Sequence, residues 1–419
     1  MGFFSSLFSG NGNRAFSYRL IMDMGTEYLK AAIIEFNDSE RNILGFAKEK
    51  QDYKSMDGGA VTDIAAVVKR ARKAIKRARS FTPHQPDELV CGIAGEFVKG
   101  VLISIDSRRQ NSDKRIRHRE IFELLKEGQK EAYQRAVKMA ESETGVSDIE
   151  LELIQQSLVE VRVDGYKVKN PRNFQGKNLG LTVFYSFAPL VQVGALSTVA
   201  KELGYRLVAV VAEPFAIASS FMNDESYEFG AAIIDIGGGT TDIALIRNGG
   251  IEGSRMFAMG GRAFTRSIAS KLHISLKEAE QIKLAYSRGE EIENYSEVDR
   301  VIKSDLHIMY QGIELSLQEL SRGELLPANI YFCGGGSAFK GLIEGLEKTA
   351  FKERLPFKQP PLIKLLIGND IKRIRDENQL LNDVEHTTPR SLSYYGSVIV
   401  VNERRLINRE SQRLQGILY

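Results

Sequence analysis

The chain has few of the residues that build disulfide frameworks or metal centres. Its two cysteines, Cys91 and Cys333, lie far apart, and each is surrounded by apolar residues. This pattern is typical of buried, reduced thiols rather than of a disulfide scaffold or a cysteine-bound metal. We therefore expect a protein of the reducing cytoplasm.

Long apolar runs and a strong charge surplus are also absent. No stretch approaches the roughly 20 apolar residues that span a bilayer, and the Phe-rich start lacks the basic region and the cleavage site of a signal peptide. Lys and Arg exceed Asp and Glu by only 57 to 54, which is too small a surplus to indicate nucleic acid as the main partner. Any membrane contact is expected to be peripheral.

The chain does have length and an internal repeat. Its 419 residues are enough for more than one hydrophobic core. An apolar run, Asp, an apolar residue, Gly and Thr are followed by another apolar strand at Asp23 and again at Asp235. This repetition predicts two halves of related architecture.

Changes in the pattern along the chain predict its organisation. A polar segment at 106–119, an amphipathic helix at about 119–142 and a hairpin with the turn Asp164-Gly165 interrupt the first half and indicate a small inserted α/β subdomain. The expected division is a flexible tail at 1–16, a first lobe at 17–103, the insert at 104–187, a return to the first lobe at 188–215, a second lobe at 216–390, a closing helix at 391–401 and a basic tail at 402–419.

Each half contains a hairpin tip that can bind phosphate. Glycine lets backbone N–H groups approach phosphate oxygens, threonine hydroxyls add donors, and an aspartate beside them offers hard oxygen ligands to Mg²⁺. Two such tips, one from each half, would close on a triphosphate from opposite sides. The residues of the two tips are Asp23, Gly25, Thr26, Asp235, Gly237, Gly238, Gly239, Thr240 and Thr241.

Further features follow in order along the chain. Glu213 ends an apolar strand, where it either orients a water or serves as a helix-start carboxylate before Pro214. Gly260 and Gly261 precede a helix, so we expect backbone amides there to be available to an anion. Glu280 and Lys283 share a helix face, where they either bracket a ribose or pair with each other. Another apolar strand leads into the glycine turn Gly334, Gly335, Gly336 and Ser337.

This series of motifs resembles, in the same order, that of the actin, Hsp70 and sugar-kinase superfamily. The resemblance extends from Arg19 to about Val401. Within the superfamily the sequence is most similar to the FtsA family, whose small subdomain is inserted at the same place. The implied fold is α/β, with two actin-like lobes built from duplicated ribonuclease-H-like domains and a small α/β subdomain inserted in the first lobe.

The resemblance also implies roles for single residues. Asp23 and Asp235 would hold Mg²⁺, Lys30 would reach phosphate, Glu213 would polarise a hydrolytic water, and Glu280, Lys283 and the Gly334 turn would hold the adenosine of ATP. Glu27 and Tyr28 depart from the pattern, because small residues usually stand there. An acid facing the terminal phosphate would repel it, so Glu27 either turns away or hydrolysis is weak.

Membrane and partner roles are implied as well. The resemblance predicts filaments at the inner face of the cell membrane that tether the tubulin-like division protein FtsZ. Two terminal segments are candidate anchors, and we favour the first. One is the apolar face Phe3, Phe4, Leu7 and Phe8, and the other combines Ile407, Leu414, Ile417 and Leu418 with Arg404, Arg405, Arg409 and Arg413.

Two alternatives stay open at this point. PilM-like pilus-assembly proteins share the insert, so a pilus protein is an alternative partner to FtsZ. A sugar kinase of the same superfamily is a weaker alternative, because no segment of the first half suggests a catalytic Asp over a sugar site.

Overall fold

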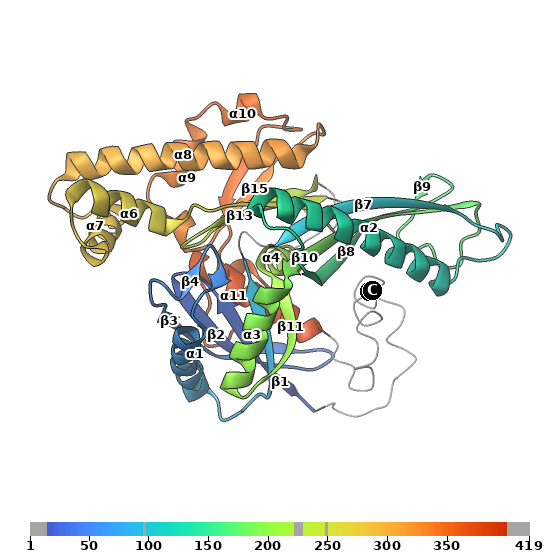
Figure 1. The fold of residues 1–419 in the computed structure, drawn as a ribbon, viewed down its shortest axis with the longest axis horizontal. Coiled ribbons are helices and arrows are strands. Elements are labelled where there is room, and N and C mark those ends of the chain that lie inside the picture. Colours follow the sequence, from blue (N-terminus) through green and yellow to red (C-terminus); the bar gives the residue numbers. More distant parts are fainter. Residues whose placement is uncertain (1–14, 95–97, 222–228, 248–249, 400–419) are drawn as a thin grey trace.

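Three large sheets and the helices packed on them organise the molecule. The computed structural model describes residues 15–94, 98–221, 229–247 and 250–399, so both expected membrane anchors lie outside the described residues. Figure 1 shows the second lobe above the first, while the inserted sheet and its helix project to the right. No helix within the described ranges has both the length and the apolar character needed to cross a bilayer.

The first lobe is built on a five-stranded sheet of order β11-β6-β1-β2-β3. β1, β2 and β3 are successively antiparallel, whereas β6 runs parallel to β1 and β11 parallel to β6. Helices α1 and α3 pack on one face, and α4 and α11 on the other. Burial of both faces explains why the apolar residues Leu20, Ile21 and Met22 of β1 are consecutive rather than alternating with polar ones.

The elements of this lobe come from three stretches of the chain. They are β1 (Ser17–Met24), β2 (Tyr28–Phe36), β3 (Arg41–Lys50), β4 (Met56–Asp57), β5 (Ala60–Val61), α1 (Ile64–Ala78), η2 (Arg79–Phe81), β6 (Glu88–Ile93), α3 (Leu190–Leu203), β11 (Arg206–Ala212), α4 (Glu213–Phe221) and α11 (Thr387–Val398). Gly204, with φ 81°, ends α3 as a left-handed cap. α11 begins at Thr387 rather than at the predicted 391, because Pro389 is tolerated in its first turn.

The second lobe repeats the arrangement of the first. Its sheet has the order β14-β13-β12-β15-β16, with β12, β13 and β14 antiparallel and β15 and β16 added in parallel. The two sheets therefore share one strand topology, which confirms the duplication predicted from the short repeat. The elements are β12 (Ala231–Ile236), β13 (Thr241–Arg247), β14 (Gly250–Phe257), α6 (Gly261–Leu272), α7 (Leu276–Arg288), α8 (Tyr295–Ser321), β15 (Asn329–Cys333), η3 (Gly335–Ala338), α9 (Leu342–Glu347), α10 (Phe351–Arg354), β16 (Leu362–Leu365), η4 (Gly368–Asp370) and η5 (Val384–His386).

The insert is a separate sheet with its own helix. Strands β7 (Lys99–Arg108), β10 (Asn178–Pro189), β8 (Leu151–Val163) and β9 (Tyr166–Lys167) pair in that order, and α2 (His118–Thr144) covers one face. The predicted turn joins β8 to β9, with positive φ at Asp164 and Gly165. Both cysteines are buried free thiols, as expected.

Candidate functional site

The two predicted hairpin tips touch each other between the lobes. One tip joins β1 to β2 at residues 25–27, and the other joins β12 to β13 at 237–240. A Cβ added to Gly238 would lie 2.7 Å from the Cβ of Glu27, and one added to Gly239 would lie 3.0 Å from the Thr26 hydroxyl oxygen. The approach therefore depends on glycine in the second tip.

Buried acids lie at the base of these tips. Asp23 is 3% exposed and forms an ion pair of 2.9 Å with Lys30, its direct partner across the hairpin. Burial alone would lower the pKa of Lys30, but the Asp23 carboxylate raises it above its ordinary value. Asp235 is 8% exposed and accepts a 2.8 Å hydrogen bond from the Thr388 hydroxyl. Burial raises the pKa of Asp235 although this hydrogen bond opposes the change.

Glu213 adds a third acid from another element. It is the first residue of α4, immediately after β11, and is 6% exposed. Burial, followed by the carboxylates of Asp23 and Asp235, raises its pKa well above the ordinary value. Its Oε1 has no hydrogen-bond partner within the described part of the chain. A buried oxygen of this kind is a position where a water or a cation would be stabilising.

The acids fit a magnesium–phosphate complex better than a metal ion held by protein alone. Within the described ranges, no three His, Cys, Asp or Glu side chains are grouped so that they could hold a metal by themselves. Mg²⁺ prefers oxygen ligands and commonly combines one or two carboxylates with water and substrate phosphates. Asp23 and Asp235, one from each half, are a donor set of that type.

The start of α6 differs from our expectation. The Gly261 amide donates to the Gly237 carbonyl at 2.9 Å, and the Arg262 amide donates to the Gly238 carbonyl at 2.8 Å. The expectation that amides here are available to an anion is therefore wrong for these two groups. The reason is close packing, since a Cβ on Gly260 would lie only 2.6 Å from the Gly237 oxygen.

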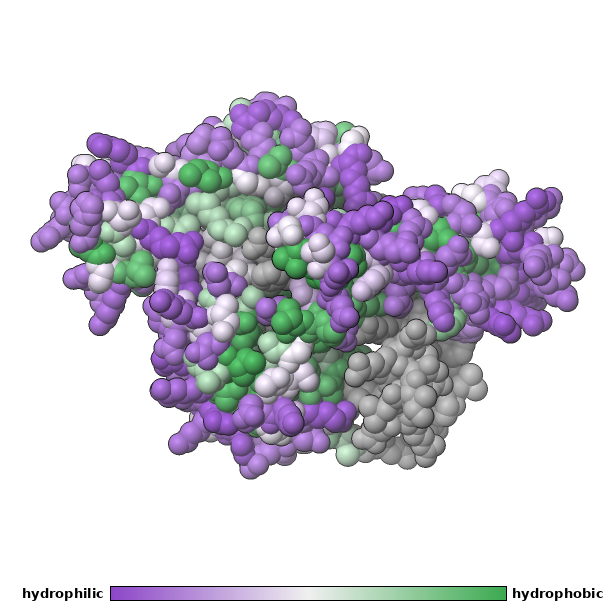
Figure 2. Space-filling view, in the orientation of Figure 1, coloured by the Kyte–Doolittle hydropathy of each residue, from purple (hydrophilic) through white to green (hydrophobic). Residues whose placement is uncertain are grey.

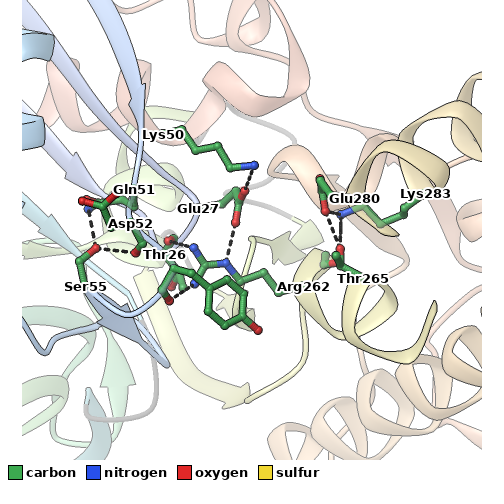
Figure 3. A network of polar contacts seen from close by, with 12 residues as sticks. Thr26, Glu27, Lys50, Gln51, Asp52, Ser55, Arg262, Thr265, Glu280 and Lys283 are labelled. Atoms are coloured by element: carbon green, nitrogen blue, oxygen red, sulfur yellow. Dashed lines mark hydrogen bonds and ion pairs between the residues drawn. The ribbon is translucent and has the colours of Figure 1, made fainter. Parts of the chain in front are cut away.

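Glu280 and Lys283 pair with each other in the described conformation. Their charged atoms lie 2.8 Å apart, and both contact the Thr265 hydroxyl of α6. Lys283 also donates to the Gly261 carbonyl at 3.1 Å. Figure 3 shows Glu280 and Lys283 of α7 pointing to Thr265 of α6, so these side chains join the two helices.

The glycine turn after β15 lies beside the second acid. A Cβ on Gly334 would lie 2.1 Å from Asp235 Oδ1, and its φ of 81° also favours glycine. The Ser337 hydroxyl donates to the Gly334 carbonyl at 2.7 Å and closes the turn. Just beyond it, the ring of Phe339 stacks on Phe264 with centroids 5.1 Å apart. The turn and α6, both predicted to hold nucleotide, are thus neighbours.

An ion pair that the sequence did not reveal crosses between the lobes. Arg262 Nε lies 2.5 Å from Glu27 Oε2, and its Nη atoms donate to the carbonyls of Thr26 and Tyr53. The guanidinium also stacks 4.8 Å above the Tyr53 ring, and Lys50 contacts the other Glu27 oxygen at 2.9 Å. Figure 3 shows the arginine of the second lobe reaching into the first.

This ion pair bears on whether Glu27 would repel a phosphate bound at the first tip. Burial would raise the pKa of Glu27, but hydrogen bonds from Arg262 and Lys50 lower it below its ordinary value. The Glu27 carboxylate is therefore charged, and Arg262 and Lys50 neutralise its charge. One sequence signal was available, because an acid in a phosphate loop requires a nearby cation, but nothing in the spacing identified Arg262, 235 positions later.

Two family models and several curated proteins match the sequence. The family model described as cell division protein FtsA matches residues 232–390, and that of MreB/Mbl protein matches 166–293. Cell division protein FtsA of Streptococcus pneumoniae is 25% identical over 81% of this chain and 75% of its own length. FtsA of Neisseria meningitidis is also 25% identical, over 79% of this chain and 81% of its own.

Comparison with solved structures agrees on the fold. A chain of the PilM-PilN type IV pilus biogenesis complex superposes with a TM-score of 0.64 at 18% identity, covering 91% of this chain and 98% of that one. Ethanolamine utilization protein EutJ from Carboxydothermus hydrogenoformans gives 0.50 at 16% identity, with 90% of each chain covered. The chain is therefore an actin-like protein with a two-lobed α/β fold, and it resembles FtsA over 81% of its length.

Proposed function

We propose that the chain binds ATP and Mg²⁺ between its two lobes. The observation that carries this proposal is the meeting of two glycine-containing hairpin tips, one from each lobe, above buried carboxylates. Backbone amides and the Thr26 hydroxyl would bind phosphate oxygens at the tips. The hydroxyls of Thr240 and Thr241, which were also expected to do so, donate instead to Asp242 Oδ2 at 2.9 Å and to the Met259 carbonyl at 2.7 Å. Asp23 and Asp235 would hold Mg²⁺, which would neutralise phosphate charge when bound.

Lys30 and Glu213 have separate roles in this proposal. Lys30 is held at the base of the first tip by Asp23, so its ammonium is positioned for a phosphate oxygen. The unpartnered oxygen of Glu213 is available to accept a hydrogen bond from water and to orient it. We expect at most slow hydrolysis. Glu280, Lys283 and the Gly334 turn would hold the nucleoside, which requires the Glu280–Lys283 pair to exchange partners.

The cellular role follows from the similarity to proteins named cell division protein FtsA. We infer an ATP-dependent adaptor that self-associates into filaments on the cytoplasmic face of the membrane and tethers an FtsZ-like division protein there. The closure of two lobes around a nucleotide gives such a protein a conformation that ATP can control.

Assembly and partner binding can be tested together. Wild type and Asp235→Asn would be centrifuged with and without ATP and Mg²⁺, in the presence of purified FtsZ from the same source. We expect ATP to increase the pelleted fraction of wild type, and pelleted wild type to carry FtsZ. Equal pelleting of both proteins under all conditions would contradict the proposed control by ATP.

A PilM-like adaptor is the second candidate, and the similarity to the PilM-PilN complex over 98% of that chain favours it. The two candidates differ in partner rather than in nucleotide chemistry. Capture of partners from native extract, followed by mass spectrometry, should recover FtsZ in the first case and a pilus-assembly protein in the second.

A further inference from the structure

The outer end of the insert is a strongly basic part of the described structure that serves no role in the nucleotide site. We call residues 108–119 and 164–177 the basic tip. They contain ten Lys and Arg residues against two Asp, a net charge of +8, in a chain whose total is +3. The remainder of the chain therefore carries −5. The charge of the molecule is separated rather than evenly mixed.

Most of these cations are available for contact. The residues of the basic tip that are exposed and form no ion pair within the described ranges are Arg108, Lys114, Arg115, Arg117, Lys169 and Lys177. Of the two acids, Asp164 is engaged within the tip, because its carboxylate accepts hydrogen bonds from the backbone amides of Lys177 and Asn178. Asp113 is the other acid of the basic tip, so the net positive charge makes this surface complementary to an anionic partner.

The two loops of the basic tip are held as one surface. Buried Arg109 pairs with Glu120 at 2.6 Å and donates to the carbonyls of Gly176 and Lys114. Additional bonds run from the Ile116 amide to the Phe174 carbonyl and from the Gly176 amide to the Ser112 carbonyl. The backbone that carries the charges is thus ordered before any partner arrives, so binding does not require the two loops to be brought together.

Aromatic side chains accompany the charges. Phe174 is 46% exposed and Tyr166 is 78% exposed, each on a loop or short strand of the basic tip. Figure 1 places this end of β7, β8 and β9 at the far right of the molecule, and Figure 2 shows that it projects outward with a hydrophilic surface. A projecting end with cations around exposed aromatics matches a flat anionic interface better than an extended strand of nucleic acid.

We propose that the basic tip binds the anionic headgroups of a lipid bilayer. Lys and Arg side chains at this end approach the lipid phosphates, while Phe174 and Tyr166 enter the interfacial region. This contact does not involve the nucleotide site or either terminal segment, so it stands or fails independently of ATP binding.

Vesicle sedimentation of the full chain tests the proposal. One set of vesicles contains one part phosphatidylglycerol to three parts phosphatidylethanolamine, and the other contains phosphatidylcholine alone. The variant Lys114→Glu/Arg115→Glu/Lys169→Glu is compared with Lys69→Glu/Lys73→Glu/Lys76→Glu, which changes the same charge on exposed positions of α1. Circular dichroism and thermal unfolding establish that both variants fold.

The readout is the ratio of binding to anionic over zwitterionic vesicles. We expect the basic-tip variant to lower this ratio at least about ten-fold and the α1 variant to leave it near wild type. Phe174→Ser should lower binding to anionic vesicles by a smaller factor. An unchanged ratio in the basic-tip variant, or an equal loss in the α1 variant, would overturn the proposal. Retained vesicle binding with lost binding to a single-stranded oligonucleotide would overturn it in favour of nucleic acid.

Discussion

The two hairpin tips carry the same short motif in different electrostatic surroundings. In the first, a cation of the same hairpin neutralises Asp23, and two further cations hold Glu27. In the second, Asp235 accepts a hydrogen bond from the Thr388 hydroxyl and forms no ion pair within the described ranges, and three glycines replace the bulky residues. The first tip is therefore charge-compensated by the protein, whereas the second leaves negative charge that a bound cation would compensate.

The largest effect on stability should come from substitutions in the first hairpin tip, where the protein itself compensates the charge of Asp23. Asp23→Ala leaves the Lys30 ammonium, 14% exposed, without its ion-pair partner, and breaking a buried pair in this way costs about 3 kcal/mol or more. Asp235→Ala removes a carboxylate whose charged form is already disfavoured by burial, so it should cost about 1 kcal/mol or less. Denaturant unfolding without nucleotide measures both.

The double variant Asp23→Asn/Lys30→Met is the control for that comparison. It removes both charges together and should be more stable than Asp23→Ala. If Asp235→Ala is as destabilising as Asp23→Ala, the two tips do not differ in the way described.

The Glu27–Arg262 pair should contribute a smaller but measurable amount. Arg262→Gln loses the ion pair and the stacking on Tyr53, with an expected cost of about 2 kcal/mol. Because the pair joins the lobes, hydrogen exchange of nucleotide-free protein should accelerate in peptides covering 25–30 and 237–241.

Lys50 provides the matched control for this pair. Its side chain is 55% exposed and contacts Glu27 within the first lobe, so Lys50→Gln should cost under about 1 kcal/mol and leave the exchange of 237–241 unchanged. Equal acceleration in both variants would show that Arg262 does not hold the lobes together.

The smallest of these effects should be a dependence of the protein's stability on pH that comes from Glu213. Since burial and the neighbouring carboxylates raise the folded-state pKa of Glu213 above its ordinary 4.5, the folded state binds a proton more tightly than the unfolded state does. The free energy of unfolding of the protein should therefore fall as the pH rises from about 4.5 through the folded-state pKa of Glu213. Glu213→Gln removes this dependence.

The comparison is made without nucleotide or Mg²⁺, by chemical unfolding between about pH 4.5 and pH 8. We expect Glu213→Gln to be more stable than wild type at the upper end and to approach it at the lower end. If the stabilities of wild type and Glu213→Gln change with pH in parallel, the pKa of Glu213 is not raised in the folded state.

Periodicity and turn residues were sufficient to predict the elements that position the site. The strand–Gly–strand repeat at Asp23 and Asp235 predicted two lobes of equal topology, and the structure confirms this in the strand orders. Helices α1 and α3 also carry local signals in the sequence, because Asp63 caps the start of the first and Gly204 ends the second. These features depend on neighbours in the sequence, so the sequence alone reveals them.

The contacts between the lobes could not be predicted in the same way. Thr388 and Arg262 reach Asp235 and Glu27 across 153 and 235 positions, and no local pattern distinguishes them from other Thr and Arg residues. The amides at the start of α6 were misjudged for a related reason. Whether they are free depends on how closely the Gly237 carbonyl approaches, which is a property of tertiary packing.

The central claim is that the two tips form a clamp for ATP and Mg²⁺, and isothermal titration tests it most directly. ATP would be titrated with and without Mg²⁺ into wild type, Asp23→Asn and Asp235→Asn, with Lys303→Ala, a surface residue of α8, as control. The clamp predicts Mg²⁺-dependent binding that either Asn variant weakens at least about ten-fold, while Lys303→Ala binds as wild type. ATP affinity that is the same in all four proteins would contradict it.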